Sequence, residues 1–249
     1  MQQKTEWFEE WFDSPYYHIL YGDRDMKEAE FFLENLIKKF NPAKDAKLID
    51  LACGAGRHSI YLNSLGFDVT GVDLSEHSIS LAKPFENNRL HFEVGDLRNL
   101  NLASKFDIAL NLFTSFGYFD CFATNMQVLG QVKALLNPKG YFLIDFMNAP
   151  KVLSKLVSAE QVHKNTITFN IQRHLQQGLI VKDISFEVDR KNYSYQEKVQ
   201  ALTLVDFETM LHGAGFQILE IFGNYKLDVF DEQDSDRLIL ICKNKDYSQ

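Results

Sequence analysis

The sequence predicts an α/β fold in which a mostly parallel β-sheet is covered by helices, with a helical cap before it and a small antiparallel β insertion within it. Short apolar segments alternate with segments of helical periodicity from residue 45 to residue 150, and such alternation is typical of parallel sheets covered on both faces. A glycine-containing turn follows the first apolar segment. Between residues 166 and 202, hydrophobic residues alternate with period two, which favours antiparallel strands.

The composition is that of an acidic globular protein. The chain has 249 residues and a formal net charge of −8, with 45% hydrophobic residues. Nucleic-acid binders usually carry a basic face, and no Lys/Arg cluster stands out, so a small-molecule substrate is favoured. Cys53, Cys121 and Cys242 have no metal or redox spacing, which fits a reducing cytoplasm, where we expect the protein to reside. We expect no membrane partner, because no run of about 18 apolar residues predicts a membrane span.

The first 44 residues are expected to form the helical cap. Hydrophobic residues at helical spacing predict helices over residues 5–12 and 26–40, and Ser14-Pro15 ends the first of them. The pattern then changes to the alternating core over residues 45–150. Its strands are expected at residues 47–51, 67–72, 90–94, 106–112 and 141–146, and its helices at residues 57–65, 78–85 and 125–136.

Residues 151–202 interrupt this rhythm and are interpreted as an insertion, not as a separate domain. Strands are expected at residues 166–175, 180–188 and 193–202, the first two joined by a turn at residues 176–178. Thr203 with Asp206 then resembles a capping box that opens a helix to His212. Residues 203–249 complete the core with strands at residues 216–222 and 237–242. The whole chain, residues 1–249, is therefore predicted to be one domain.

The most informative segment is residues 48–57, LIDLACGAGR. A buried strand runs into a turn with Gly54 and Gly56, and a helix begins at once. Glycine lets the backbone bend tightly and approach a ligand closely, and the helix N-terminus favours an anion. Ser59 stands where the dinucleotide fingerprint has its third glycine, which counts against NAD or FAD.

Two acids follow the next two strands. Asp73 ends the second strand, where nucleotide-binding α/β folds place an acid that binds two ribose hydroxyls. Asp96 ends the third strand, where a carboxylate can accept a hydrogen bond from an adenine amino group. Leu97 beside it can offer its backbone N–H to a ring nitrogen. The alternatives are a helix cap for Asp73 and an Asx-turn for Asp96.

With these motifs, the sequence resembles the class I (Rossmann-like) S-adenosylmethionine (SAM)-dependent methyltransferases, in their small-molecule branch. The resemblance covers residues 45–147 and 203–243, and Ala52 departs from it, since the family often has glycine there. It implies a seven-stranded sheet with a reversed last strand, SAM as cofactor and S-adenosylhomocysteine as product. It also implies a cofactor site that we expect at Asp50, Ala52, Gly54, Gly56, Arg57, Asp73, Leu74, Asp96, Leu97, Asn111, Leu112, Phe113, Tyr16 and Tyr21.

The acceptor side is less defined. Residues 111–119, NLFTSFGYF, resemble the matching segment of small-molecule N-methyltransferases, including amino-sugar dimethyltransferases and the glycine methyltransferase group. Candidates for a catalytic role are Tyr118, Tyr21 and Asp145. Arg24 or Arg57 could pair with the SAM carboxylate.

Three functions stay open at this point. The first is methyl transfer from SAM to nitrogen or oxygen of a small molecule. The second is SAM binding without turnover, and the third is a nicotinamide-dependent oxidoreductase. We expect no metal site, because no His/Asp/Glu cluster has ligand spacing, and either a monomer or a homodimer. The insertion is expected to form part of the substrate pocket or a dimer contact.

Overall fold

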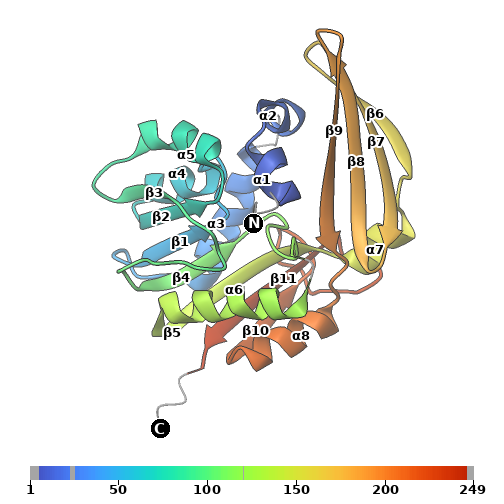
Figure 1. Ribbon diagram of the computed structural model, residues 1–249. Coiled ribbons are helices and arrows are strands. Elements are labelled where there is room, and N and C mark those ends of the chain that lie inside the picture. Colours follow the sequence, from blue (N-terminus) through green and yellow to red (C-terminus); the bar gives the residue numbers. More distant parts are fainter. Residues whose placement is uncertain (1–5, 23–25, 120, 246–249) are drawn as a thin grey trace.

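The computed structural model describes residues 6–22, 26–119 and 121–245 and contains two β-sheets (Figure 1). The strands of the larger sheet are β1 (Lys47–Leu51), β2 (Asp68–Asp73), β3 (Leu90–Val94), β4 (Phe106–Asn111), β5 (Leu136–Met147), β10 (Phe216–Phe222) and β11 (Arg237–Asn244). Their spatial order is β10-β11-β5-β4-β1-β2-β3. β11 runs antiparallel to both β5 and β10, and the other pairs are parallel. The predicted α/β fold with one reversed strand is thus confirmed.

Helices cover both faces of this sheet, and two of them begin at side-chain caps that the sequence offers. Ser75 caps α5 by accepting a hydrogen bond from the backbone N–H of Ser78 (3.0 Å), so this helix begins two residues earlier than expected. The capping box of Thr203 and Asp206 opens α8 as predicted. The helices of the core are α3 (Met26–Phe40), α4 (Arg57–Ser64), α5 (Glu76–Ala82), the 3₁₀ turn η1 (Lys83–Phe85), α6 (Phe122–Leu135), α7 (Ala149–Ser154) and α8 (Leu204–Gly213).

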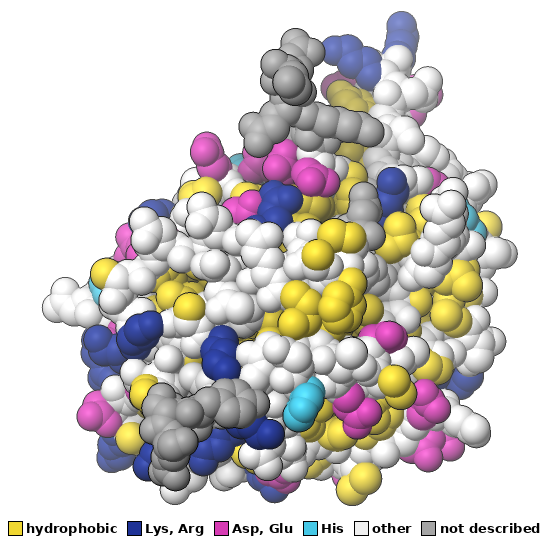
Figure 2. All heavy atoms as spheres, turned by 60° about the horizontal axis from the view of Figure 1, so that its bottom comes forward, with side chains coloured by type: hydrophobic (Ala, Val, Ile, Leu, Met, Phe, Trp, Pro, Cys, Tyr) yellow, Lys and Arg dark blue, Asp and Glu magenta, His cyan; other side chains and the backbone are white. Residues whose placement is uncertain are grey.

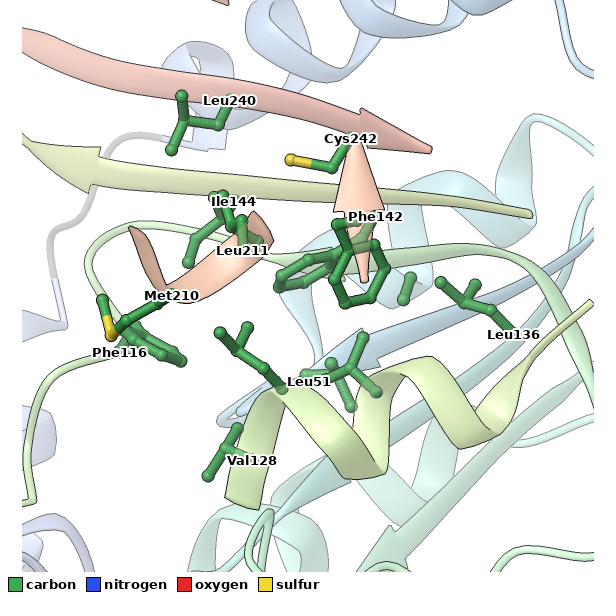
Figure 3. Close-up of a cluster of buried hydrophobic side chains, with 14 of the residues drawn as sticks. Leu51, Phe116, Val128, Leu136, Phe142, Ile144, Met210, Leu211, Leu240 and Cys242 are labelled. Atoms are coloured by element: carbon green, nitrogen blue, oxygen red, sulfur yellow. The ribbon is translucent and has the colours of Figure 1, made fainter. Parts of the chain in front are cut away.

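Two hydrophobic layers hold the core together. One packs α6 and α8 on the sheet through residues such as Val128, Met210 and Ile144, which Figure 3 shows in close-up. The other packs α3, α4 and α5 on the opposite face through residues such as Phe32 and Leu62. Burying each large apolar side chain contributes about 1.5–3 kcal/mol. The sheet edge between these layers is therefore a rigid platform for a ligand.

The cap differs from the expected helix–turn–helix. After α1 (Trp7–Phe12), the chain forms a further helix, α2 (Pro15–Tyr21), before α3. The Ser14 side chain accepts a hydrogen bond from the backbone N–H of Tyr16 (3.2 Å), and Pro15 occupies the first helical position. Proline is favourable there because its missing N–H would have no helical partner. The predicted end of the first helix before Ser14-Pro15 is confirmed, but the second helix that begins at Pro15 was not predicted.

The insertion forms a four-stranded antiparallel sheet, where three strands were expected. Its strands are β6 (Ala159–Lys164), β7 (Ile167–Gln176), β8 (Leu179–Val188) and β9 (Lys191–Gln200). The predicted turn between β7 and β8 is confirmed, with Gln177 and Gly178 at φ values of 51° and 79°. One face of this small sheet packs against α1 and α2 through Trp11, Leu20 and Phe186. Helices α1 and α2, called the cap from here on, therefore lie between the two sheets, as Figure 1 shows, whereas α3 of the expected cap packs on the core.

The remaining surface is mixed in character. Figure 2 brings the α6 and α8 side of Figure 1 forward and shows hydrophobic side chains near the middle of this face, with charged groups around them. Phe122 and Val205 are exposed large hydrophobic residues of these two helices. Within the described part of the chain, no helix is long and apolar enough to cross a membrane.

Candidate cofactor site

A cavity of about 350 Å³ lies at the carboxyl ends of β1 to β4, between this sheet edge and the cap. In parallel α/β sheets, ligands bind at this edge. Of the residues expected at the cofactor site, ten line the cavity: Ala52, Gly54, Arg57, Asp73, Leu74, Asp96, Leu97, Leu112, Phe113 and Tyr21. The catalytic candidate Tyr118 lines it as well, so the local motifs converge on one space.

Other expected residues do not line the cavity. Asp50 and Asn111 are buried beneath it, and Gly56 packs at the start of α4. Tyr16 turns to the small sheet, where its ring contacts the rings of Phe186 and Tyr193 at 4.7 and 4.8 Å. Asp145 is fully buried behind β4. The expected contact of Tyr16 and the expected catalytic role of Asp145 therefore have no direct geometric basis. Arg24 lies outside the described residues.

The backbone of the glycine turn after β1 enters the left-handed region, which residues other than glycine rarely adopt. Gly54 and Gly56 have φ values of 56° and 79°, and Ala52 has a φ of 58°. The backbone N–H of Gly54 donates to Asp73 Oδ2 at 2.7 Å. The turn is thus fastened to the end of β2, and Ala52 bears a strain that glycine would avoid.

Replacing Ala52 with glycine is expected to leave the protein equally stable or to stabilise it by up to about 1 kcal/mol. The left-handed φ costs alanine about 1–2 kcal/mol, and the greater freedom of glycine in the unfolded chain offsets part of the gain. Urea denaturation followed by circular dichroism measures the difference. A loss above about 1 kcal/mol would show that the methyl group makes contacts worth more than the strain.

Asp73 is half-buried and holds its carboxylate in a fixed position. Oδ2 accepts from Gly54, and Oδ1 accepts from the backbone N–H of Ser75 at 2.9 Å. Burial raises the pKa of Asp73, although these backbone donors oppose the shift. A carboxylate has about four lone-pair sites, so each oxygen can still accept one further hydrogen bond from a ligand.

The Asp96 carboxylate already binds another side chain of the protein, and this contact was not predicted from the sequence. Arg98 donates through Nε to both carboxylate oxygens at 3.0 and 2.8 Å, and its Nη2 lies 2.7 Å from Oδ2. Burial raises the pKa of Asp96, but the hydrogen bonds from Arg98 outweigh it and hold the pKa below its ordinary value. The Asp96 carboxylate is therefore ionised and rigid at the cavity wall.

Asp50 is the fully buried acid beneath the glycine turn. Its Oδ2 accepts a hydrogen bond from the Ser59 hydroxyl at 2.7 Å. Burial raises the pKa of Asp50 to about 7, and the nearby charge of Asp73 adds to the shift, while the Ser59 hydrogen bond opposes it. The position of Asp50 beneath the turn predicts that this residue supports the turn and does not contact a ligand.

This acid gives a testable pH dependence. In the unfolded chain Asp50 ionises near its ordinary pKa of 3.8, whereas in the folded protein it keeps its proton up to about pH 7. Its contribution to stability is therefore complete below about pH 4 and is lost as the pH rises through about 7, by at most about 4 kcal/mol. We expect Asp50→Asn to flatten the fall in unfolding free energy between about pH 4 and pH 7. An unchanged slope in thermal denaturation would contradict this assignment. Ser59→Ala should extend the fall to higher pH, because it removes a hydrogen bond that opposes the raised pKa.

The cap supplies an aromatic wall to the cavity. Phe8, Phe12 and Tyr17 line it beside Tyr21. The Tyr21 hydroxyl donates to Glu197 Oε1 of β9 at 2.6 Å and also contacts the ammonium group of Lys182 of β8. The Tyr21 ring thus faces the cavity while its hydroxyl is engaged by the small sheet. No residue of the small sheet lines this cavity itself, so the insertion shapes it through the cap.

Tyr118 is also engaged within the protein. Its hydroxyl donates to the carbonyl oxygen of Thr114 at 2.6 Å, and its ring contacts those of Trp7 and Phe12 at 5.6 and 5.3 Å. A ring held on two sides is suited to shape a pocket. Its hydroxyl would have to leave the Thr114 carbonyl before it could act on a substrate.

Two cap residues were not predicted for this site: Asp13, which holds the cap on α5, and His18, which lines the cavity. Asp13 accepts hydrogen bonds from the Ser75 hydroxyl (2.8 Å) and the His77 backbone N–H (2.9 Å), which fastens the cap to α5. His18 lines the cavity, and its buried Nε2 has no hydrogen-bond partner within the described part of the chain. Burial lowers the pKa of His18, and the nearby His77 lowers it further, so the ring is neutral at neutral pH.

A second hollow of about 630 Å³ lies where the β7–β8 turn meets α6 and α8. Phe122, Gly178 and Leu202 are among its lining residues, and none of the expected site residues is. The described residues include no group of three His, Cys, Asp or Glu side chains placed to hold a metal ion. The candidate site is therefore the cavity under the cap.

Comparisons with known proteins agree on one family. Residues 42–203 match the family described as "Methyltransferase domain". The chain is 25% identical over 242 residues to a glycine/sarcosine N-methyltransferase of Halorhodospira halochloris, covering 93% of this chain and 85% of that protein. It is 24% identical over 200 residues to the dTDP-3-amino-3,4,6-trideoxy-alpha-D-glucopyranose N,N-dimethyltransferase of Streptomyces venezuelae, covering 77% of this chain and 83% of that protein.

The fold has close counterparts among solved structures. A crystal structure of an S-adenosylmethionine-dependent methyltransferase from Clostridium acetobutylicum matches it with a TM-score of 0.79 and 22% sequence identity. The match covers 93% of this chain and 96% of that chain. The match therefore extends over most of both chains.

Proposed function

Because the chain belongs to the methyltransferase-domain family and is a class I SAM-dependent methyltransferase, we propose that it methylates a nitrogen atom of a small molecule. One observation carries the proposal: the cavity is roofed by the aromatic cap and measures about 350 Å³, within the range of small-molecule sites. The names of the two curated relatives, which both specify transfer to nitrogen, support the choice of atom. The family also assigns SAM, rather than a nicotinamide, as the cofactor.

The residues at the cavity fit this cofactor. We propose that Asp73 accepts hydrogen bonds from the two ribose hydroxyls, and that Asp96 and the Leu97 backbone contact the adenine. Arg57 at the start of α4 would pair with the cofactor carboxylate. The unpartnered Nε2 of His18 supports the fit, because a buried polar nitrogen at a cavity wall is costly unless a ligand or water satisfies it.

The bound cofactor supplies an electrophilic methyl group on a sulfonium. The chain itself has to align the acceptor with that group and exclude water. We propose that the rings of Phe12, Tyr17 and Tyr118 do both, because the Phe12 ring contacts the other two at centroid distances of 5.1 and 5.3 Å. A side-chain base is required only for an acceptor that arrives protonated.

A methyl-transfer screen tests the proposal. The full-length protein would be incubated with radiolabelled SAM and one acceptor class at a time: amino acids and their N-methyl derivatives, amino-sugar nucleotides, phenols, carboxylates and tRNA. We expect label on an amine of low molecular mass and release of S-adenosylhomocysteine. Transfer to oxygen alone would overturn the choice of atom, and transfer to tRNA alone would overturn the acceptor class. SAM binding without transfer in any class would favour a non-catalytic binding protein.

A further inference from the structure

The loop after β4 holds two consecutive non-glycine residues in the left-handed region. Phe113 has a φ of 57° and Thr114 a φ of 63°. Such residues persist only where the surrounding structure fixes them, and they gather at functional sites. Phe113 lines the cavity. Something must therefore hold this segment in place at the cofactor edge.

Asp145 of β5 accepts the hydrogen bonds that keep this segment in place. The backbone N–H of Phe113 donates to Asp145 Oδ2 at 2.9 Å, and the backbone N–H of Thr114 donates to the Asp145 carbonyl oxygen at 2.9 Å. Both strained residues thus hydrogen-bond to one fully buried residue. In both bonds the donor is a backbone N–H group. The bonds therefore fix the backbone conformation whichever side chains stand at these two positions.

Arg237 of β11 fixes Asp145 in turn. Its Nε donates to Asp145 Oδ1 at 2.7 Å, while its Nη2 donates to the Thr114 hydroxyl at 3.0 Å. The Tyr225 hydroxyl donates to Asp145 Oδ2 at 3.2 Å. The planar guanidinium can make these two bonds at once because its donors have a fixed fork geometry. The carboxylate charge is compensated, as a buried charge must be.

The conformation of Phe113 sets the place of its ring, and two residues of α4 rest on that ring. The guanidinium carbon of Arg57 lies 4.5 Å from the ring centroid, and the His58 ring stacks on it at 4.9 Å with an interplanar angle of 21°. Stacking on an aromatic face orients an arginine while leaving its edge donors available to an anion.

We propose that Asp145 and Arg237 are positioning residues for cofactor binding: by fixing Phe113 and Thr114 in the left-handed conformation they orient Arg57 toward the cofactor carboxylate. This rests on the proposed function, in which the cavity binds SAM. Neither residue is among the described residues that line the cavity. The pair acts from β5 and β11 on the backbone of Phe113 and on Thr114.

The test measures affinity and stability separately. Calorimetry gives the Kd for S-adenosylhomocysteine well below the unfolding temperature, and circular dichroism gives the Tm. We expect Asp145→Asn and Arg237→Lys to raise the Kd on the order of tenfold, and to raise the KM for SAM while kcat at saturating SAM stays near its original value. The lysine keeps the charge but cannot make both guanidinium bonds.

A second substitution addresses the strain directly. Glycine adopts a positive φ without penalty, so Thr114→Gly added to Asp145→Asn should recover part of the lost affinity. The matched control is Lys151→Met, which removes the bonds of Lys151 to Asp234 and Asp236 and leaves the Asp145–Arg237 pair in place. This variant should keep the original Kd.

The outcomes are distinct. A lower Tm with unchanged Kd in Asp145→Asn and Arg237→Lys would show a merely structural pair and overturn the inference. Loss of affinity that Thr114→Gly does not relieve would overturn the role of strain. Should Asp145→Asn not fold, Arg237→Lys with and without Thr114→Gly carries the same comparison. Absence of S-adenosylhomocysteine binding by the unaltered protein would instead overturn the proposed function.

Discussion

Asp73→Ala is expected to raise the Kd for SAM by roughly 100-fold or more, because hydrogen bonds to a charged group contribute about 1.5–3 kcal/mol each and two would be lost. The Asp73 carboxylate is already oriented by the backbone N–H groups of Gly54 and Ser75 at 2.7 and 2.9 Å. We therefore expect it to bind a ribose diol without further loss of side-chain freedom. Titration calorimetry with SAM and S-adenosylhomocysteine measures the effect.

Two controls separate ligand contact from damage to the glycine turn. Asp73→Asn keeps the shape and one acceptor oxygen, so we expect an intermediate affinity. Asp68→Ala at the opposite end of β2 should bind like the unaltered protein. A folded Asp73→Ala variant with unaltered affinity would contradict the ribose assignment. If Asp73→Ala binds poorly and also has a lower Tm, the affinity of Asp73→Asn decides between a lost ligand contact and damage to the turn.

The second large effect is expected in stability. Gly56 has a φ of 79°, and an added Cβ would lie 2.5 Å from Phe92 Cε1, 2.6 Å from Phe92 Cζ and 3.2 Å from Ala82 Cβ. Phe92 is fully buried, so its ring cannot move aside cheaply. Strain and overpacking together should lower the unfolding free energy of Gly56→Ala by about 2–4 kcal/mol.

Gly54→Ala is the matched control in the same turn. Gly54 also has a positive φ, of 56°, but an added Cβ would meet no heavy atom within 4 Å. Only the conformational penalty of about 1 kcal/mol should remain. Urea denaturation of both variants compares them. Equal losses would show that strain alone, without the contact with Phe92, governs the turn.

The core was predicted from local patterns in the sequence. The strands ending at Leu51, Asp73 and Val94 lie where the apolar segments indicated, because a buried parallel strand has a continuous apolar signature. The strand β6 was missed because most of its residues are exposed and it lacks a clear apolar alternation. The helix α2 was missed because proline both ends helices and begins them.

The contacts that shape the cavity depend on residues far apart in the chain. Arg237 and Asp145 are 92 positions apart, and Trp11 and Glu197 are 186 apart. No periodicity or turn signal records such a pair, so the sequence suggested Asp145 as a catalytic candidate instead of a buried partner of Arg237. Arg98 lies only two residues from Asp96, and its bond could have been predicted from that spacing.

The cap also carries a natural optical reporter. The chain has two tryptophans, and both, Trp7 and Trp11, belong to α1. Trp7 touches the cavity-lining ring of Tyr118, and Trp11 donates to Glu197 of the small sheet at 2.6 Å. Intrinsic tryptophan emission therefore arises from α1 alone. Because Trp7 lies beside a ring that lines the cavity, we expect ligand entry and departure to change this emission in a stopped-flow measurement, without an attached dye.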